Sequence, residues 1–234
     1  MPVLQLKSPE LREVSVESVR SRDVTGLVPW RSFRSHRGQR HYSGVYWSAT
    51  TGGHVGYESR LELARLLFAD MDPAVAWIVA QPFRMVVEVN GKQRSHVPDY
   101  LLSIVDGSFV VVDVKPLRRL DDPAVRLTFD WAREIAADCS WGFEVFSEPD
   151  PVLLGNVRFL AGYRRGWLFE PDRVAAVEDA VADGVTIGEA ERELASSFDP
   201  RLTRPVLMHL LWLGRLRTDL TAPLSSMNVL ERAL

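Results

Sequence analysis

The stretch VPDYLLSIVDGSFVVVDVKP, residues 97–116, decides the fold of this chain. A Pro-Asp pair opens one apolar segment, an Asp-Gly pair supplies a turn, and a second apolar segment ends in Asp-Val-Lys. Segments rich in valine, leucine and isoleucine predict two buried strands, which the turn joins into a hairpin. The start of the first strand and the end of the second then meet, so Asp99, Asp113 and Lys115 are predicted at one end of the hairpin.

Two carboxylates and one ammonium group at such a point can hold a divalent metal ion beside a phosphodiester. A hard cation on carboxylate oxygens activates water and stabilises charge on phosphoryl oxygens. We expect Asp99 and Asp113 to be the core ligands, with the carbonyl of Val114 as a neutral third ligand. Lys115 would orient the attacking water and lower its pKa, or hold the scissile phosphate.

Each element of this pattern also has a structural interpretation. Asp99 after Pro98 is suited to the entry of a strand, and Asp-x-Lys to a surface ion pair. The combination favours the catalytic interpretation, because Asp113 and Lys115 share one strand face and follow a buried valine run. Unused charges at such a position would be costly.

A third acid is expected from the helix that the apolar spacing predicts over residues 57–70. Glu62 would complete the metal shell or hold a second ion, and Glu58 is the alternative, since the two lie four apart on one helix face. Gln81, at a strand end, is a candidate for hydrogen bonding in the same site, with a structural role as the alternative. His96 is a candidate for contacting the phosphate or a metal ligand, although a regular strand would place it on the face opposite Asp99.

The remaining pattern predicts an α/β fold with a central mixed sheet flanked by helices. Residues 1–50 are expected to be irregular, with strand-like pieces near 3–6 and 45–47. Asn90-Gly91 predicts a tight hairpin turn between two strands. The further predicted strands are 75–79, 84–89, 93–97 and 142–146, and the second predicted helix is 123–139.

Residues 147–151 hold two prolines and mark the best domain boundary, giving domains at 1–150 and 151–234. Strand signals then nearly vanish, and four helices are predicted at 152–165, 171–183, 187–196 and 201–213. Thr186 is an expected N-cap. Three helices followed by a short strand near 214–220 are the outline of a winged helix-turn-helix.

The helix at 201–213 is the expected recognition helix, although apolar residues cover nearly every face of it. Arg201, Arg204 and His209 are left for base edges or phosphates. Part of the apolar excess belongs to the domain core, and we expect the remainder to form a surface that docks a partner protein.

Composition excludes several classes of protein. The chain has 234 residues, 46% hydrophobic and 25% charged, as in folded soluble proteins. It has no apolar run near the ~18 residues that span a membrane and no secretory signal pattern at its start. Cys139 is the only cysteine, so no internal disulfide forms and a cytoplasmic location is expected.

The net charge of −3 does not by itself indicate nucleic-acid binding, but one local patch does. Residues 30–41 contain two histidines, four arginines and no acid. This patch is either a solvated basic loop or an arm that contacts DNA phosphates. Its arginines are Arg31, Arg34, Arg37 and Arg40.

The chain resembles the TnsA-type endonuclease subunit of heteromeric transposases. The resemblance rests on five short motifs and spans most of the chain. These motifs are ESRLELA (58–64), DPAV (72–75), QPF (81–83), VPDYL (97–101) and VDVKP (112–116). PD…DxK alone occurs in many nucleases, but the order of the set is more specific.

The resemblance implies a restriction-endonuclease-like PD-(D/E)xK core followed by a winged-helix domain. It implies a Mg²⁺-dependent endodeoxyribonuclease, with Mn²⁺ able to substitute, that cuts the 5′ ends of a transposon during cut-and-paste transposition. The implied partners are double-stranded DNA at the transposon ends, a DDE-type transposase subunit and an AAA+ ATPase regulator. By motif, the metal-binding carboxylates are Glu62, Asp99 and Asp113, with Lys115 as the catalytic lysine.

Two other functions fit parts of the same pattern. An independent PD-(D/E)xK nuclease could act in restriction, repair or phage DNA processing, and it would cut naked DNA without partners. A non-catalytic winged-helix regulator could carry a decayed nuclease core, but the intact Asp99, Asp113 and Lys115 argue against it.

Overall fold

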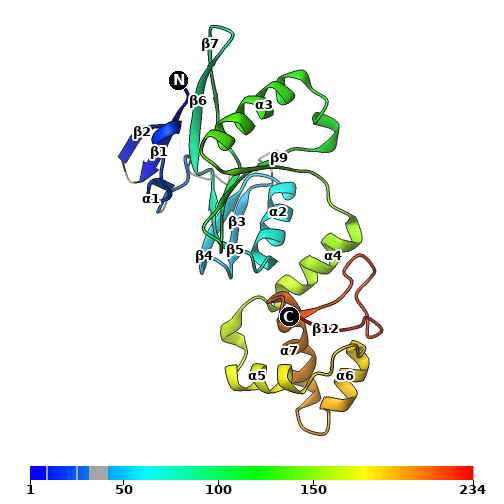
Figure 1. Cartoon of the computed structure of the whole chain (residues 1–234). Helices are drawn as coiled ribbons and strands as arrows, with labels where there is room; N and C mark the ends of the chain where they lie inside the picture. Colours follow the sequence, from blue (N-terminus) through cyan, green and yellow to red (C-terminus); the bar gives the residue numbers. More distant parts are fainter. Residues whose placement is uncertain (9, 25, 32–41, 234) are drawn as a thin grey trace. The chain divides into compact units, whose positions relative to one another are not determined.

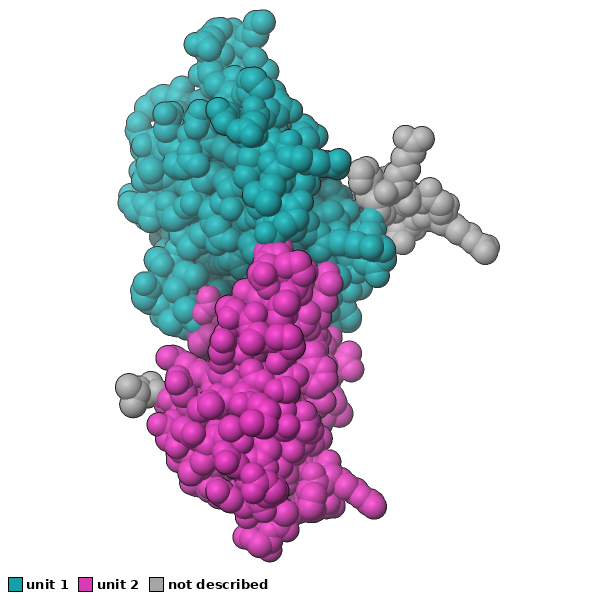
Figure 2. Space-filling model, turned by 90° about the vertical axis from the view of Figure 1, so that its right-hand side faces the viewer, with its two compact units in different colours: residues 1–69, 74–148 teal, residues 70–73, 149–234 magenta. Residues whose placement is uncertain are grey.

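The computed structural model describes residues 1–8, 10–24, 26–31 and 42–233, which form two compact units (Figure 1). Unit 1 comprises residues 1–69 and 74–148, and unit 2 comprises residues 70–73 and 149–234, coloured separately in Figure 2. In the described residues, no helix has the length and apolar character needed to span a membrane. The architecture is mixed α/β, consistent with a restriction-endonuclease-like fold.

The central sheet of unit 1 has four strands in the order β10-β9-β8-β5. β8 runs antiparallel to both of its neighbours, whereas β9 and β10 are parallel and are connected through helix α3 (Pro123–Asp138). The sheet is therefore mixed, as predicted. Its strands are β5 (Val75–Ala80), β8 (Tyr100–Ile104), β9 (Phe109–Val114) and β10 (Gly142–Phe146).

The two long helices of unit 1 cover opposite faces of this sheet. Helix α2 (Arg60–Met71) packs Phe68 against Phe146, with ring centroids 5.9 Å apart. Helix α3 packs Phe129 against Phe143, at 6.1 Å. Residues 143 and 146 of one strand point to opposite faces, so α2 and α3 sandwich the sheet.

A second sheet, in the order β2-β1-β6-β7, packs with α3 and the central sheet around one core. Leu4 and Leu6 of β1 and Phe83 and Met85 of β6 are fully buried there, together with Val111 of the central sheet. The predicted strand-like pieces near 3–6 and 45–47 are confirmed, and the prediction of an otherwise irregular start was wrong, since residues 10–15 also form a strand. The strands are β1 (Val3–Ser8), β2 (Glu10–Ser15), β6 (Phe83–Val89) and β7 (Lys92–His96).

The smaller elements of unit 1 connect these layers. Strands β3 (Gly44–Ser48) and β4 (Gly53–Tyr57) form an antiparallel ribbon. The Asn90-Gly91 turn joins β6 to β7, and both residues have positive φ, of 52° and 70°, as the dipeptide predicted. The short helical segments are η1 (Val16–Ser18), α1 (Ser21–Val24) and η2 (Leu117–Arg119).

A two-point ion pair fixes α2 to the sheet. The guanidinium of Arg65 donates from Nε and Nη2 to the two carboxylate oxygens of Glu144, at 2.7 and 2.8 Å. Arg65 is 9% exposed, so its charge depends on this partner. The pair matters for the site because Glu62 lies one helical turn before Arg65 on α2.

We predict that Glu144→Ala lowers the free energy of unfolding by about 2–3 kcal/mol, because it leaves the buried guanidinium of Arg65 without its carboxylate. Urea denaturation measures this loss. Asp130→Ala is the control, since it removes a pair with Arg133 in which both side chains are exposed. That change should stay within about 0.5 kcal/mol, and equal losses in the two variants would contradict the prediction.

Unit 2 consists of helices followed by a two-stranded ribbon. Asp150, Thr186 and Asp199 cap three of the helices with their side-chain oxygens, and Thr186 forms a full capping box with Glu189, so its predicted role is confirmed. All four predicted helices are present. The elements are α4 (Pro151–Leu160), η3 (Ala161–Tyr163), η4 (Gly166–Leu168), α5 (Pro171–Ala180), α6 (Ile187–Leu194), α7 (Pro200–Trp212), β11 (Leu216–Arg217) and β12 (Glu231–Arg232).

Helix α7 is the centre of unit 2 and packs against α4, α5, α6 and β11. Residues 206–212 are all buried, so the apolar excess of this helix is domain core. The prediction that part of it forms a partner-docking surface was therefore wrong. Among the large apolar residues of α7, only Leu202 is exposed, and the C-cap residue Leu213 is exposed as well.

His209 of α7 is also unavailable to DNA. It is 4% exposed, its ring stacks on Phe169 at 4.2 Å, and its Nδ1 lies 2.6 Å from the carbonyl oxygen of Tyr163. Burial lowers the pKa of His209, although the carbonyl opposes this. Of the predicted DNA contacts on α7, Arg204 pairs with Glu191 at 3.1 Å, and Arg201 is exposed.

Candidate active site

Asp99 and Asp113 lie side by side at one end of the β8–β9 hairpin. Tyr100 pairs with Val112 in the antiparallel register, so Asp99, one residue before β8, lies opposite Asp113. The amide of Val114 donates to Oδ2 of Asp99 at 2.6 Å, which fixes that carboxylate against β9. Both aspartates line a pocket of ≈ 490 Å³, together with Lys115.

Lys115 is held at the rim of this pocket by its backbone. Its amide donates to the carbonyl of Phe146 at 2.9 Å, and its carbonyl accepts from the hydroxyl of Ser147 at 2.6 Å. The side chain is partly buried and lies two residues after Asp113 on the same strand face. The structure thus brings the three predicted residues of the hairpin together.

The carboxylates repel one another. Burial raises the pKa of Asp99 well above its usual range, and the charges of Glu62 and Asp113 raise it further, while Val114 and Lys115 oppose the shift. Burial also raises the pKa of Glu62. The ionised cluster therefore lacks enough positive charge, and a bound cation would supply it.

Glu62 lies close enough for its charge to raise the pKa of Asp99, but it does not line the pocket of Asp99 and Asp113, and Glu58 is placed differently from the prediction. Helix α2 begins at Arg60, so Glu58 precedes it and shares no helix face with Glu62. Oε2 of Glu62 accepts from the amide of Glu58 at 2.7 Å, and the hydroxyl of Ser59 accepts from the amide of Glu62 at 3.1 Å. This resembles a capping box, which holds Glu62 in the first turn and explains why the helix starts later than its apolar pattern suggested.

His96 contacts Asp113 directly, which fits its predicted candidacy for contacting a metal ligand. Its Nε2 lies 2.7 and 2.9 Å from the two carboxylate oxygens of Asp113. Its ring packs edge-on against Trp131 of α3, at 6.1 Å. The placement that a regular strand would give does not apply, because His96 ends β7 in the second sheet, whereas Asp99 precedes β8 in the central sheet.

Gln81, the residue between β5 and β6, is strained and incompletely bonded. It has φ 45°, which L-residues rarely adopt. Its amide donates to the carbonyl of Asp99 at 2.8 Å, and its carbonyl accepts from the amide of Trp30 at 2.8 Å. The side chain is buried, and its Oε1 has no hydrogen-bond partner within the described part of the chain.

We predict that Gln81→Gly raises the free energy of unfolding by about 1 kcal/mol, because glycine accepts a positive φ without strain and leaves no unpaired amide oxygen. Urea denaturation of Gln81→Ala provides the comparison. Alanine removes the amide but keeps the strain, so it should stabilise less than glycine. If the glycine variant is less stable than the alanine variant, the backbone at residue 81 is not strained and the prediction is contradicted.

The predicted basic patch lies mostly outside the described residues, including Arg34, Arg37 and Arg40. Arg31 is described, exposed, and lines the same pocket as Asp99. A second arginine of this pocket, Arg84 of β6, was not predicted from sequence. The Asn90-Gly91 turn could have indicated this position of Arg84. The turn sets the register of β6 and β7, with Met85 opposite His96, and so brings Arg84 near the Pro-Asp motif.

The residues fit a hard divalent cation in donor type. Glu62, Asp99 and Asp113 offer carboxylate oxygens. As they are placed, no three His, Cys, Asp or Glu side chains in the described ranges converge in a group that could hold a metal ion. His96 engages both oxygens of Asp113 in this arrangement. The predicted ligand role of the Val114 carbonyl stays a prediction.

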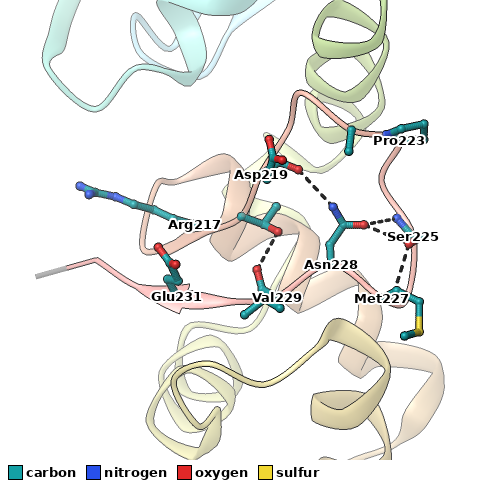
Figure 3. Close-up of a pocket in the computed structure, with 10 residues that line it drawn as sticks. Arg217, Asp219, Pro223, Ser225, Met227, Asn228, Val229 and Glu231 are labelled. Atoms are coloured by element: carbon teal, nitrogen blue, oxygen red, sulfur yellow. Dashed lines mark hydrogen bonds between the residues drawn. The ribbon is translucent and has the colours of Figure 1, made fainter.

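A larger pocket, of ≈ 730 Å³, lies in unit 2 beside the loop between β11 and β12 (Figure 3). Its polar groups hold the loop itself. Asn228 donates to the carbonyl of Asp219 at 3.1 Å and accepts from the amide of Ser225 at 2.7 Å, and Thr218 donates to the carbonyl of Val229 at 2.7 Å. Because these groups are engaged in the loop, the pocket of unit 1 is the better candidate for catalysis.

A mixed sheet between helices, with Asp99, Asp113 and Lys115 at one end of a central hairpin, is consistent with a restriction-endonuclease-like fold. Residues 72–148 match the family described as TnsA-like endonuclease N terminal, which confirms the resemblance to TnsA-type endonucleases for this segment. The match covers β5 to β10 and includes Asp99, Asp113 and Lys115, but it covers neither Glu62 nor most of unit 2. No curated protein matches the chain.

Proposed function

We propose that the chain is a Mg²⁺-dependent DNA endonuclease subunit of a heteromeric transposase, cutting the 5′ ends of a transposon. The observation that carries the proposal is the grouping of Asp99, Asp113 and Lys115 in one pocket within the segment that matches the TnsA-like family. The family relationship supports a DNA substrate and a transposase context. A DDE-type transposase and an AAA+ ATPase are the proposed partners.

In this mechanism Glu62, Asp99 and Asp113 would hold a divalent cation, which when bound would supply stabilisation of the charge on the phosphoryl oxygens. Lys115 orients the attacking water and donates to the phosphate. His96, supported by Trp131, fixes the carboxylate of Asp113 from its other side.

For unit 2 we propose a winged-helix role in binding DNA or a partner. The order of α5, α6 and α7 followed by the β11–β12 ribbon supports this assignment. The buried α7 argues that contacts come from its first turn, at Arg201, and from the ribbon rather than from the whole length of the helix.

A nicking assay on supercoiled plasmid carrying transposon ends tests the proposal. The chain is incubated with Mg²⁺, Mn²⁺, Ca²⁺ or EDTA, with and without the partner transposase. We expect 5′-end cuts with Mg²⁺ or Mn²⁺ that increase when the transposase is present. A matched preparation of Asp99→Asn excludes a contaminating nuclease.

The outcomes separate the candidate functions. Mg²⁺-dependent cutting of naked DNA at unrelated sequences, indifferent to the transposase, would instead identify an independent nuclease. DNA binding without cutting under any metal, with or without the transposase, would identify a regulator and overturn the catalytic proposal.

A further inference from the structure

The pocket that contains the catalytic candidates has two walls of opposite charge. Asp99 and Asp113 form the acidic wall, which the central sheet supplies. Arg84 belongs to the other wall and comes from β6 of the second sheet. The two charges therefore reach one cavity from different layers of unit 1.

Arg84 is partly buried and incompletely paired. Its Nη2 donates to the hydroxyl of Ser95 on the adjacent strand, at 2.9 Å. Among the described residues it forms no ion pair with a carboxylate, although Asp99 and Asp113 line the same pocket. An arginine carries five N–H donors, so most of the hydrogen-bonding capacity of Arg84 remains for a ligand.

A guanidinium held in this way is suited to a phosphate. Its planar fork donates two parallel hydrogen bonds to phosphate oxygens, and its charge is permanent. Arg31, exposed at the same pocket, adds a positive charge to those of Arg84 and Lys115. A DNA strand in the pocket presents phosphates on both sides of the scissile bond, so one phosphate can meet the carboxylate wall while its neighbour meets Arg84.

We propose that Arg84 is a DNA-positioning residue that binds a phosphate adjacent to the scissile one. This inference rests on the proposed nuclease function. Ser95 orients the guanidinium, and the residue acts on substrate affinity rather than on the chemical step. It differs from Lys115, which is placed beside the carboxylates.

The test compares Arg84→Gln with Arg94→Gln. Arg94 lies on the same hairpin, is exposed, and does not line the pocket. Fluorescence anisotropy in Ca²⁺ measures the affinity for a duplex that contains a transposon end, over a range of salt concentrations. Cleavage kinetics in Mg²⁺ separate KM from kcat.

We expect Arg84→Gln to weaken DNA binding and raise KM about tenfold, to leave kcat within about twofold, and to reduce the slope of log Kd against log salt by about one. Arg94→Gln should change Kd less than about threefold. If Arg84→Gln does not fold, Arg84→Lys replaces it, and this variant should keep the salt slope but lose affinity because it lacks the fork.

Equal effects at Arg84 and Arg94, or a loss in kcat with unchanged KM, would overturn the inference while leaving the nuclease intact. A wild-type protein that neither binds nor cuts end-containing DNA would instead overturn the proposed function. The two failures are thus distinguishable in one set of experiments.

Discussion

Asp99→Asn is expected to reduce DNA cleavage at least about a thousandfold, because it removes a charged oxygen from the predicted metal shell. The same change is expected to stabilise the metal-free protein at neutral pH. Asparagine can still accept the hydrogen bond from the amide of Val114, and it carries no charge to be repelled by Glu62 and Asp113. A purely structural aspartate would show the opposite result, a loss of stability.

The sign of the pH dependence follows from the raised pKa of Asp99. The folded protein holds the proton more tightly than the unfolded chain, whose aspartates titrate near about pH 4. The neutral carboxyl of Asp99 therefore makes its full contribution to the free energy of unfolding below that pH. This contribution is lost as the pH rises through the pKa of Asp99 in the folded protein. The free energy of unfolding of Asp99→Asn should thus exceed that of the wild type most at pH 8 and little at pH 4, as measured by urea denaturation in EDTA.

Metal addition should reverse this difference. Mg²⁺ binds the ionised carboxylates, so it should raise the melting temperature of the wild-type protein at pH 8 more than at pH 5, where protons compete. Asp99→Asn should respond much less. A wild-type melting temperature that is independent of Mg²⁺ at pH 8 would count against a metal site in this pocket.

Asp106→Asn is the matched control, on the turn of the same hairpin. Its carboxylate accepts from the amide of Ser108 at 2.8 Å, and hydrogen bonds to Ser108 lower the pKa of Asp106. Removing that charge should leave cleavage within about twofold of wild type and should not stabilise the protein at pH 8. The two aspartates therefore differ in both readouts.

The central hairpin was predictable from sequence because each of its features is local. Asp99 and Asp113 are fixed by strand direction and by the two-residue period. The Asn90-Gly91 turn between β6 and β7 was predictable for a similar reason, because it depends only on the backbone conformations that these two residues allow. No comparable local signal shows that β6 and β7 lie outside the central sheet and that β6 pairs with β1. That pairing joins residues about eighty positions apart and depends on the burial of Leu4 and Leu6.

The site contacts that could not be placed from sequence depend on such tertiary relationships. His96 reaches Asp113 only because the second sheet folds over the end of the central one. Glu58 fell outside α2 because side-chain capping by Ser59 and Glu62, rather than apolar periodicity, sets the start of the helix. The same limitation applies to α7, whose apolar faces could be assigned to the core only once its neighbours were known.

Lys115→Met is expected to lower kcat about 10²- to 10⁴-fold, the range for a group that assists proton transfer or charge stabilisation in the transition state. Methionine fills similar space, and the backbone bonds of Lys115 to Phe146 and Ser147 keep the position of the chain. The affinity for DNA in Ca²⁺ should change far less than kcat. The measurement is single-turnover cleavage at saturating Mg²⁺ across pH 6–9.

Lys115→Arg separates the two roles of the ammonium group. Burial raises the pKa of both Asp99 and Glu62, and the charge of Lys115 opposes these shifts. Methionine removes that opposition, so the pH profile of Lys115→Met should move to higher pH, because more alkaline conditions are needed to ionise the carboxylates. Arginine keeps the charge, so its profile should stay near that of wild type while kcat falls, since a guanidinium cannot take the place of the smaller ammonium beside the phosphate. A Lys115→Met protein with wild-type kcat and an unshifted profile would remove Lys115 from the mechanism and leave the carboxylates alone to carry the chemistry.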